Sequence, residues 1–240
     1  MNNTPPEKLG RSITRDALRG GPIVSCQAPP DSPLHDPQII AAIAQAALNQ
    51  GALALRLDTP AHVQAVRQRI DATIPIIGLW KQSIPDCEVY ITPQFHHAAA
   101  IAQAGADIIA IDATLRERPN GETLGNLIAQ IHHNLGKLVM ADVDTLEAAI
   151  SSANLGADIL GTTLYGYTRA TQHLSPPGFD LLAQMTQQLP PDSFIICEGG
   201  IASPDMAAKA LAIGADAVVI GTDITGIDAK VKAYHRAMNP

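Results

Sequence analysis

Eight polar or charged residues stand at the ends of short apolar runs in the sequence, and several of them have side chains that can transfer protons. They are Gln27, Arg56, Lys81, Asp112, Asp142, Thr163, Glu198 and Thr222. Lys81 and Glu198 are of most interest, because an amine and a carboxyl group can act together as base and acid. Taken singly, each residue is as easily a solvated strand end. Together they predict an acid-base site, provided that the fold gathers them.

The apolar runs alternate with amphipathic stretches of helical period. The runs occupy residues 23–26, 52–57, 75–80, 107–112, 138–142, 158–163, 194–199 and 217–222. Apolar strands separated by helices indicate a parallel sheet that is buried on both faces. Eight such units in 240 residues predict an α/β fold, a single (β/α)8 TIM barrel. An open doubly wound sheet is the competing architecture.

Local signals mark where the helices begin and end. The phrases QAGADIIAID, NLGADILGTT and AIGADAVVIG each place a glycine where a helix must stop in a left-handed conformation, at Gly105, Gly156 and Gly214. Ser203 before Pro204 is a predicted N-cap, and Asp144 or Thr145 is another. Residues 1–20 precede the first run and are expected to form a short helical extension that closes the N-terminal end of the barrel. No linker divides the chain, so residues 1–240 are predicted to form one domain.

The composition limits the kinds of ligand and the cellular environment that are expected for this protein. A net charge of -7 argues against broad binding of nucleic acid or anionic membranes, so an anionic ligand must be held by a local arrangement. Cys26, Cys87 and Cys197 form no C-x-x-C pair, and their odd number suits a reducing compartment. The first residues contain no apolar leader, and no run approaches the roughly 18 residues of a membrane span. These features predict a soluble, cytoplasmic protein.

Lys81 and Glu198 end the third and the seventh run, so they face each other across the mouth of an eight-stranded barrel. Active sites of this fold lie at that end, on the loops after the strands. Enclosure there would remove water from both side chains and favour the neutral amine and the neutral carboxyl. The pair therefore predicts proton transfer. A salt bridge that only closes the top of the barrel is the alternative.

Two glycine-containing turns follow the seventh and eighth runs, in CEGGIASP and IGTDIT. Barrel enzymes commonly bind phosphate at this place, through main-chain N–H groups and a helix N-terminus. The predicted phosphate-binding residues are Gly199, Gly200, Ile201, Gly221 and Thr222. Glycines that merely serve tight turns are the alternative.

No metal site is predicted. The adjacent pairs His96–His97 and His132–His133 lack the i, i+3 or i, i+4 spacing of helix metal ligands, and both pairs are expected on solvated helix faces. Cys26 and Cys197 lie within strands and are expected to behave as small core residues.

Several segments resemble one enzyme family in order and spacing. They are GGPIVSCQAPPDSPL, IIGLWK, DCEVYITP, AGADIIAIDAT, RPNGETL, MADVDTLEAA, GADILGTTLYGYT, CEGGIASPDMAAKAL and GADAVVIGTDIT. The chain resembles the N-acylglucosamine-6-phosphate 2-epimerases, also called N-acetylmannosamine-6-phosphate 2-epimerases, from about Gly20 to its last helix. The combination of SCQ, IGLWK and GTTLYGYT is not a general barrel feature. The resemblance implies a cofactor-free interconversion of N-acetylmannosamine 6-phosphate and N-acetylglucosamine 6-phosphate, in sialic-acid catabolism or amino-sugar metabolism.

The resemblance also implies roles for individual positions. The site residues are Lys81 and Glu198 for catalysis and Gln27, Arg56, Asp142 and Thr163 for substrate binding. Lys81 would abstract or return the proton at C2, and Glu198 would assist in ring opening or in reprotonation. A homodimer is implied as well.

Two positions depart from the family pattern, which often has a serine at Tyr165 and an arginine near the phosphate at Gly226. The sequence therefore leaves open a catalytically weakened barrel that binds a phosphosugar or a protein partner. It also leaves open another phosphate-handling barrel enzyme, an isomerase or aldolase in which Lys81 forms a Schiff base.

Overall fold

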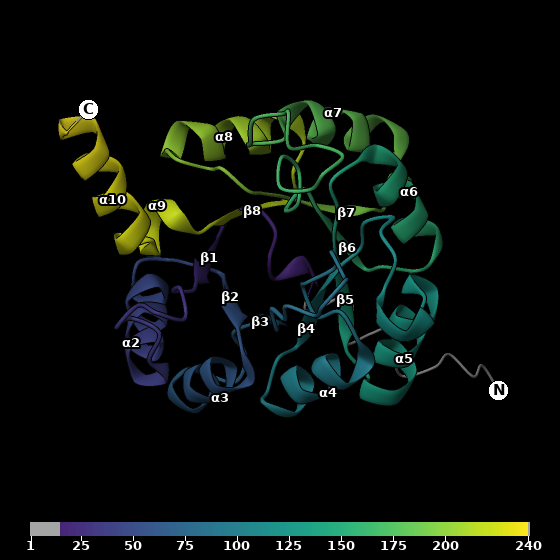
Figure 1. Cartoon of the computed structure of the whole chain (residues 1–240), viewed down its shortest axis with the longest axis horizontal. Coiled ribbons are helices and arrows are strands. Elements are labelled where there is room, and N and C mark those ends of the chain that lie inside the picture. The colour runs from purple at the N-terminus through teal and green to yellow at the C-terminus, as the bar shows by residue number, and fades with distance from the viewer. Residues whose placement is uncertain (1–14, 240) are drawn as a thin grey trace.

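The computed structural model describes residues 15–239, which contain a closed barrel of eight parallel strands (Figure 1). The strands are β1 (Pro22–Cys26), β2 (Ala54–Asp58), β3 (Ile76–Leu79), β4 (Ile108–Asp112), β5 (Leu138–Asp142), β6 (Ile159–Gly161), β7 (Phe194–Glu198) and β8 (Ala217–Ile220). Each strand pairs with the next in the chain, and β8 pairs with β1 where Val219 lies opposite Ile23. The predicted barrel is confirmed, and the open-sheet alternative is wrong.

Helices cover the outside of the barrel (Figure 1). Between residues 15 and 239 they are α2 (Pro37–Asn49), α3 (Pro60–Arg69), α4 (Phe95–Gln103), α5 (Leu124–Leu135), α6 (Leu146–Asn154), α7 (Phe179–Gln188), α8 (Pro204–Ile213), α9 (Thr222–Thr225) and α10 (Ile227–Met238), with a short 3-10 turn at Pro119–Gly121. The strands are apolar on both faces because one face packs inside the barrel and the other against this ring of helices.

Alternation along each strand decides which residues reach the mouth of the barrel. In β4, Ile108 and Ala110 belong to the interior cluster, whereas Ile109 and Ile111 pack against the helices. Asp112 lies two residues after Ala110, so its side chain points to the same side as the interior residues. In six other strands, counting forward in steps of two from an interior residue leads in the same way to a polar residue at the C-terminal end. These residues are Gln27, Arg56, Lys81, Asp142, Thr163 and Glu198. The alternation therefore aims these side chains at one place.

The predicted helix boundaries are confirmed. The backbone has positive φ after α4, α6 and α8, with values of 109°, 92° and 120° at Gly105, Gly156 and Gly214. Ser203 caps α8 by accepting a hydrogen bond from the N–H of Met206 at 3.2 Å. Of the two candidates before α6, Thr145 is the cap, since its side chain accepts from the N–H of Ala148.

The described end of the N-terminal extension lies at the bottom of the barrel. Leu18 is fully buried in the interior cluster, together with Phe194, the first residue of β7. The guanidinium of Arg19 stacks over the Phe194 ring, 5.0 Å from its centroid. These contacts support the predicted closure of this end. Residues 1–14 lie outside the described part of the chain, so a helix over residues 1–20 and a single domain over residues 1–240 stay predictions.

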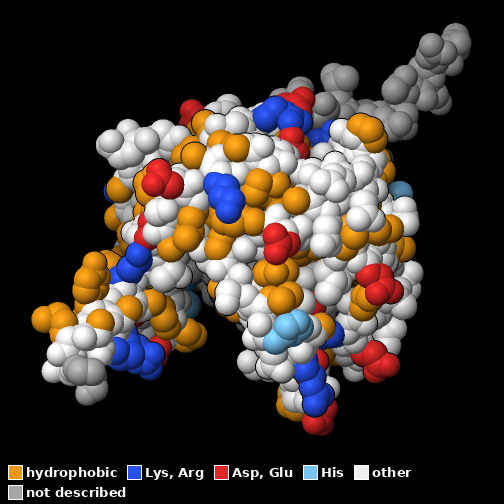
Figure 2. Space-filling model, turned by 90° about the horizontal axis from the view of Figure 1, so that it is seen from above, with side chains coloured by type: hydrophobic (Ala, Val, Ile, Leu, Met, Phe, Trp, Pro, Cys, Tyr) orange, Lys and Arg blue, Asp and Glu red, His pale blue; other side chains and the backbone are white. Residues whose placement is uncertain are grey.

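Helix α10 stands away from the barrel and carries hydrophobic side chains (Figure 2). Ile227, Val231, Tyr234 and Met238 are between 56% and 77% exposed. Their spacing places them on one face of the helix. Within residues 15–239, no helix has the length and apolar character needed to cross a bilayer.

Candidate active site

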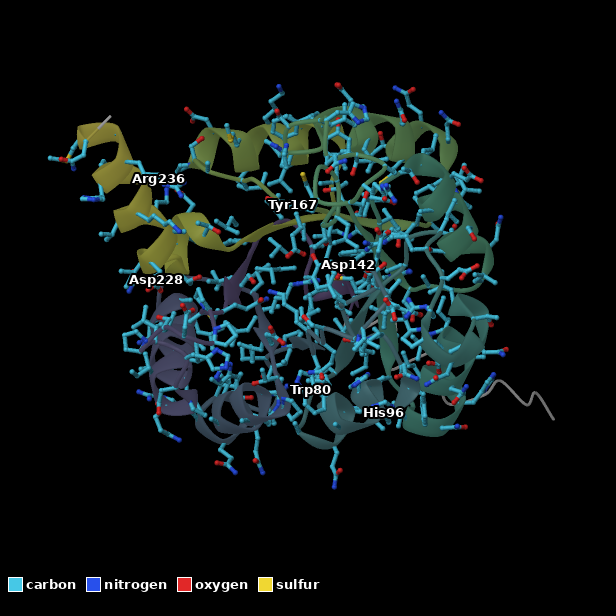
Figure 3. The ribbon with its side chains drawn as sticks, viewed as in Figure 1. Trp80, His96, Asp142, Tyr167, Asp228 and Arg236 are labelled. Carbon is cyan, nitrogen blue, oxygen red and sulfur yellow. The ribbon has the colours of Figure 1, made fainter. Side chains whose placement is uncertain are left out.

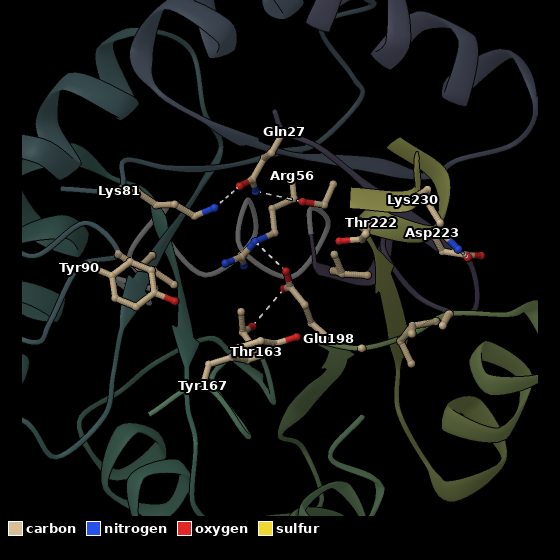
Figure 4. A pocket seen from close by; sticks show the side chains of 18 residues that line it. Gln27, Arg56, Lys81, Tyr90, Thr163, Tyr167, Glu198, Thr222, Asp223 and Lys230 are labelled. Carbon is tan, nitrogen blue, oxygen red and sulfur yellow. Dashed lines mark hydrogen bonds and ion pairs between the residues drawn. The ribbon is translucent and has the colours of Figure 1, made fainter. Parts of the chain in front are cut away.

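A cavity of about 480 Å³ opens at the C-terminal ends of the strands (Figure 4). The predicted site residues that line it are Gln27, Arg56, Lys81, Thr163, Glu198, Gly199, Gly200, Ile201, Gly221 and Thr222. They come from distant parts of the chain and meet because their strands end at the same rim. Asp142 is the predicted site residue that does not line the cavity.

A charge network centred on Arg56 lies at the base of the cavity. Arg56 is 1% exposed, and its Nη1 and Nη2 atoms donate to the carboxylate oxygens of Asp142 at 3.1 and 2.6 Å. Its Nε atom lies 3.1 Å from Oε1 of Glu198, an ion pair that lacks the alignment of a hydrogen bond. Burial alone would lower the pKa of Arg56, but the Asp142 and Glu198 carboxylates hold that pKa above its ordinary value. Arg56 is therefore a fixed cation.

Glu198 is placed to exchange a proton near neutral pH. Its side chain is 12% exposed. Burial is the largest of the effects that together raise the pKa of Glu198 to about 7, with the charge of Arg56 opposing the shift and that of Asp142 adding to it. A carboxyl group with this pKa is present in both protonation states at the pH of the cell, as an acid-base catalyst must be.

Thr163 links the two carboxyl groups. Its Oγ1 atom lies 2.7 Å from Oδ1 of Asp142 and 3.1 Å from Oε2 of Glu198. A hydroxyl group has one proton, so it can donate to only one of these oxygens at a time. When Thr163 donates to Asp142, a protonated Glu198 can donate to Thr163 and complete the chain. The geometry thus accommodates the neutral form of Glu198.

Asp142 lies outside the cavity lining but contacts residues that line it. It is fully buried, near the centre of the barrel in Figure 3, and its carboxylate contacts Arg56 and Thr163. That Asp142 contacts a ligand directly stays a prediction; in the structure its carboxylate holds Arg56 and Thr163, which do line the cavity. Asp112 is occupied as well, because its carboxylate pairs with Arg116 at 2.6 Å.

Lys81 stands at the rim of the cavity, just beyond β3. Its Nζ atom donates to Oε1 of Gln27 at 2.5 Å and lies 3.8 Å from Oδ2 of Asp58. The expectation of an enclosed lysine is wrong, because the side chain is 46% exposed where the strand has already ended. The carboxylate that pairs with Lys81 is that of Asp58, so a salt bridge to Glu198 does not close the barrel.

Bare backbone borders the cavity on the side of β7 and β8. Gly199 and Gly200 follow β7 with φ angles of 94° and 72°, a conformation that favours glycine. A Cβ atom on Gly200 would lie 2.5 Å from the side chain of Pro176. Gly221 and Thr222 follow β8, where α9 begins. The turns therefore bring main chain close to the cavity, as an anion site requires.

A family model supplies the identification. The model described as "Putative N-acetylmannosamine-6-phosphate epimerase" matches residues 40–240. The chain belongs to this family. The match begins within α2 and therefore includes Arg56, Lys81 and Glu198.

Individual relatives agree with the epimerase family model. A Synechococcus elongatus protein described as "Putative N-acetylmannosamine-6-phosphate 2-epimerase" is 61% identical over 92% of this chain and 95% of its own. A Klebsiella pneumoniae protein of the same description is 44% identical over 91% of this chain and 90% of its own. A solved structure of the N-acetylmannosamine-6-phosphate 2-epimerase from Clostridium perfringens is 36% identical, with a TM-score of 0.87 over 93% of this chain and 95% of that one.

Some cavity residues of this epimerase family member were missed by the sequence analysis. They are Ser25, Tyr90, Tyr167, Asp223 and Lys230. Tyr90 reaches the mouth because the chain turns back after Lys81, which pairs with Ile91 in an isolated bridge. Burial is the main cause that raises the pKa of Tyr90 to about 12. Tyr90, Tyr167 and Lys230 lie beyond the strand ends, where counting along a strand does not reach. The motif DCEVYITP, which contains Tyr90, was the available signal.

The histidine pairs were predicted to be solvated, and this is half wrong. His96 and His133 are exposed, whereas His97 and His132 are buried, because a helix that packs on the barrel turns one of two adjacent positions inward. His97 stacks edge-on against Trp80, and burial lowers its pKa to about 4. Within residues 15–239, no three His, Cys, Asp or Glu side chains are grouped to hold a metal ion.

The two strand cysteines are core residues, as predicted. Cys26 and Cys197 are fully buried. Burial raises the pKa of Cys26 to about 12 and that of Cys197 to about 11, which keeps both thiols protonated. Tyr165, one of the two departures from the family pattern, also packs against an apolar cluster rather than the cavity.

Proposed function

We propose that this protein is a cofactor-independent 2-epimerase that interconverts N-acetylmannosamine 6-phosphate and N-acetylglucosamine 6-phosphate. The observation that carries the proposal is the match of the family model, together with an amine and a neutral-range carboxyl group on one barrel-mouth cavity. The reaction belongs to the isomerase class.

The chemistry needs one base and one acid. In the open-chain sugar, C2 lies next to the C1 carbonyl, which makes the proton on C2 acidic. Lys81 takes this proton as the neutral amine, while Glu198 donates a proton to O1, and the product is a neutral enol. The enol then turns its opposite face to Lys81, which returns a proton to C2 while O1 gives its proton back to Glu198. This restores both side chains and gives the other epimer. The carbonyl itself supplies the acidity, so no cofactor is required.

Other side chains hold the substrate. Gln27 lines the cavity and accepts a hydrogen bond from Lys81. It is therefore proposed to orient the lysine and to bind a substrate hydroxyl. Arg56 and Thr163 are proposed to bind hydroxyls or the N-acetyl group, with Asp142 holding them in place. The turns at Gly199–Ile201 and Gly221–Thr222 are proposed to receive the phosphate, at the side of the cavity away from Lys81.

Proton NMR in deuterated water tests this function directly. The protein incubated with N-acetylmannosamine 6-phosphate should produce N-acetylglucosamine 6-phosphate and place deuterium at C2. The weakened-barrel alternative predicts binding without either change. An aldolase-like enzyme would instead form a Schiff base on Lys81, which borohydride would trap.

Asp142 offers a prediction on pH. Turnover needs one proton shared between Lys81 and Glu198, so activity falls where both are protonated. Asp142 adds to the raised pKa of Glu198 and Arg56 opposes it. Asp142→Asn should therefore lower the pKa of Glu198 and move the acidic limb of kcat/KM to lower pH. Asp112→Asn is the matched control, since that buried carboxylate pairs with Arg116 instead. An unmoved limb in Asp142→Asn would contradict the assignment.

We also propose that the protein forms a homodimer. The exposed apolar face of α10, formed by Ile227, Val231, Tyr234 and Met238, supports a homodimer. We expect light scattering to give about twice the 25.2 kDa chain mass, and Val231→Asp to shift the protein toward the monomer. A monomeric mass for the unmodified protein would refute this. A cytoplasmic location is consistent with the family and stays a prediction.

A further inference from the structure

In the described part of the chain, the cavity has one cation at its base and two cations at its sides. Among the described residues that line it, the positively charged ones are Arg56, Lys81 and Lys230. Arg56 is held by Asp142 and Glu198 at the base. Figure 4 shows Lys81 and Lys230 on opposite sides, with Glu198 between them. If the C2 end of the sugar lies at Lys81, its other end lies toward Lys230.

Lys230 is built into the phosphate side of the cavity. It belongs to the first turns of α10, and its backbone N–H bonds to the carbonyl oxygen of Gly226 at 2.9 Å. Its ammonium group is paired with the carboxylate of Asp223, which follows Thr222 in α9. The Lys230 side chain is 42% exposed, so it is free to leave this partner for an anion in the cavity.

We propose that Lys230 is the cation that binds the substrate phosphate, and that Asp223 holds it over the site until substrate arrives. This inference rests on the proposed epimerase function. It accounts for the missing family arginine with a residue one turn further along the chain. In the complex, the phosphate dianion takes the place of Asp223 as the partner of Lys230, while the glycine turns supply main-chain contacts.

Gly226 leaves little room for a side chain in this backbone conformation. A Cβ atom there would lie 2.8 Å from the Cα and the carbonyl oxygen of Thr222, so any larger residue would press on the backbone that begins α9. Gly226 also borders a neighbouring cavity of about 550 Å³ rather than the one that contains Glu198. An arginine at Gly226 would require the phosphate-side turn to shift, whereas Lys230 already lines the cavity that contains Glu198.

The first arm of the test removes the cation. Lys230→Ala should raise KM for N-acetylmannosamine 6-phosphate by about tenfold and change kcat little, because the phosphate is remote from C2 and binds alike in ground and transition states. Lys232→Ala is the matched control: this exposed lysine lies on the same helix and does not line the cavity. The affinity for inorganic phosphate, measured by calorimetry, should fall in the same variant.

The second part of the test removes the carboxylate of Asp223, which competes with the phosphate for Lys230. Asp223→Asn should lower KM by about threefold, because it frees Lys230 and removes a negative charge beside the phosphate. Opposite effects of the two variants are the signature of the proposal, since a purely structural ion pair would give losses in both.

These experiments distinguish failure of the proposed role of Lys230 from failure of the proposed epimerase function. If the unmodified protein epimerises the substrate and Lys230→Ala leaves KM and phosphate affinity within about twofold of Lys232→Ala, Lys230 is not the phosphate cation. If Lys230→Ala instead lowers kcat with KM unchanged, the proposal is equally overturned. If the unmodified protein shows no turnover, the epimerase proposal fails, and loss of calorimetric phosphate binding in Lys230→Ala still supports the anion role of Lys230.

Discussion

Lys81→Ala should lower epimerase turnover by about 10² to 10⁴, the usual range for loss of a general base. The same variant should lose deuterium exchange at C2, because the other lysine among the described residues that line the cavity, Lys230, lies on its opposite side (Figure 4). The fold should survive, since the Lys81 side chain is 46% exposed at the rim of the barrel. Proton NMR in deuterated water reports exchange and epimerisation together.

Lys81→Arg is the matched control that separates a base from a binding cation. Arginine keeps the positive charge and can still donate to Gln27, but a guanidinium does not release its proton in a protein. If Lys81 only binds substrate, this variant should retain most of the activity. We expect it to be as inactive as Lys81→Ala. Retained C2 exchange in either variant would remove Lys81 from the role of base.

The fold was predictable because its signals are local and repeated. Gly105, Gly156 and Gly214 each stop a helix, and an apolar strand starts at once. Arg56 and Glu198 were found without the structure because each is a polar residue at the end of an apolar run, and the strands of a barrel end together at its mouth. Closure of the ring follows from the number of units and right-handed crossovers.

The depth of each site residue was not predictable. Lys81 and Asp142 both follow interior positions of their strands, yet one is at the exposed rim and the other is fully buried. Depth depends on where each strand ends relative to its neighbours, and this stagger is a property of the closed barrel that a single run of sequence does not contain. Tyr90 and Lys230 were missed for a related reason, because loops and outlying helices carry them to the cavity.

The proposed role of Lys230 shows the same limit. Alignment by motif compares one position with one position, so the sequence shows only that an arginine is absent. The structure shows that Lys230, one turn further along the chain, lines the cavity that contains Glu198. Loss of the expected residue therefore does not favour a weakened barrel.

Glu198→Gln should lower turnover by about 10² to 10⁴, comparable to loss of Lys81, because an amide cannot exchange the proton that O1 requires. Glutamine keeps the shape of the side chain and an oxygen that can face Arg56. Its amide also removes a partly buried charge, so the fold should be retained. Turnover measured by NMR at neutral pH checks the size of the loss.

The pH dependence of kcat/KM distinguishes an acid-base role of Glu198 from a role in holding Arg56. Burial is the main cause that raises the pKa of Glu198 to about 7. Below that pH Glu198 keeps its proton, and the Lys81–Glu198 pair has no site left for the proton from C2. Activity should therefore rise with pH up to about 7, in both directions of the reaction, since both directions use the same total number of protons.

Glu198→Gln should abolish that limb as well as lower the rate. A glutamine does not titrate, so the remaining activity should no longer fall below about pH 7 through this group. Glu198→Asp provides the contrast, because it keeps a carboxyl group beside Arg56 but withdraws it from the cavity by one methylene group, so a limb should remain while the rate falls. If Glu198→Gln keeps both the limb and a rate within about tenfold of the unmodified protein, the group that titrates is another one, and Glu198 serves only to fix Arg56.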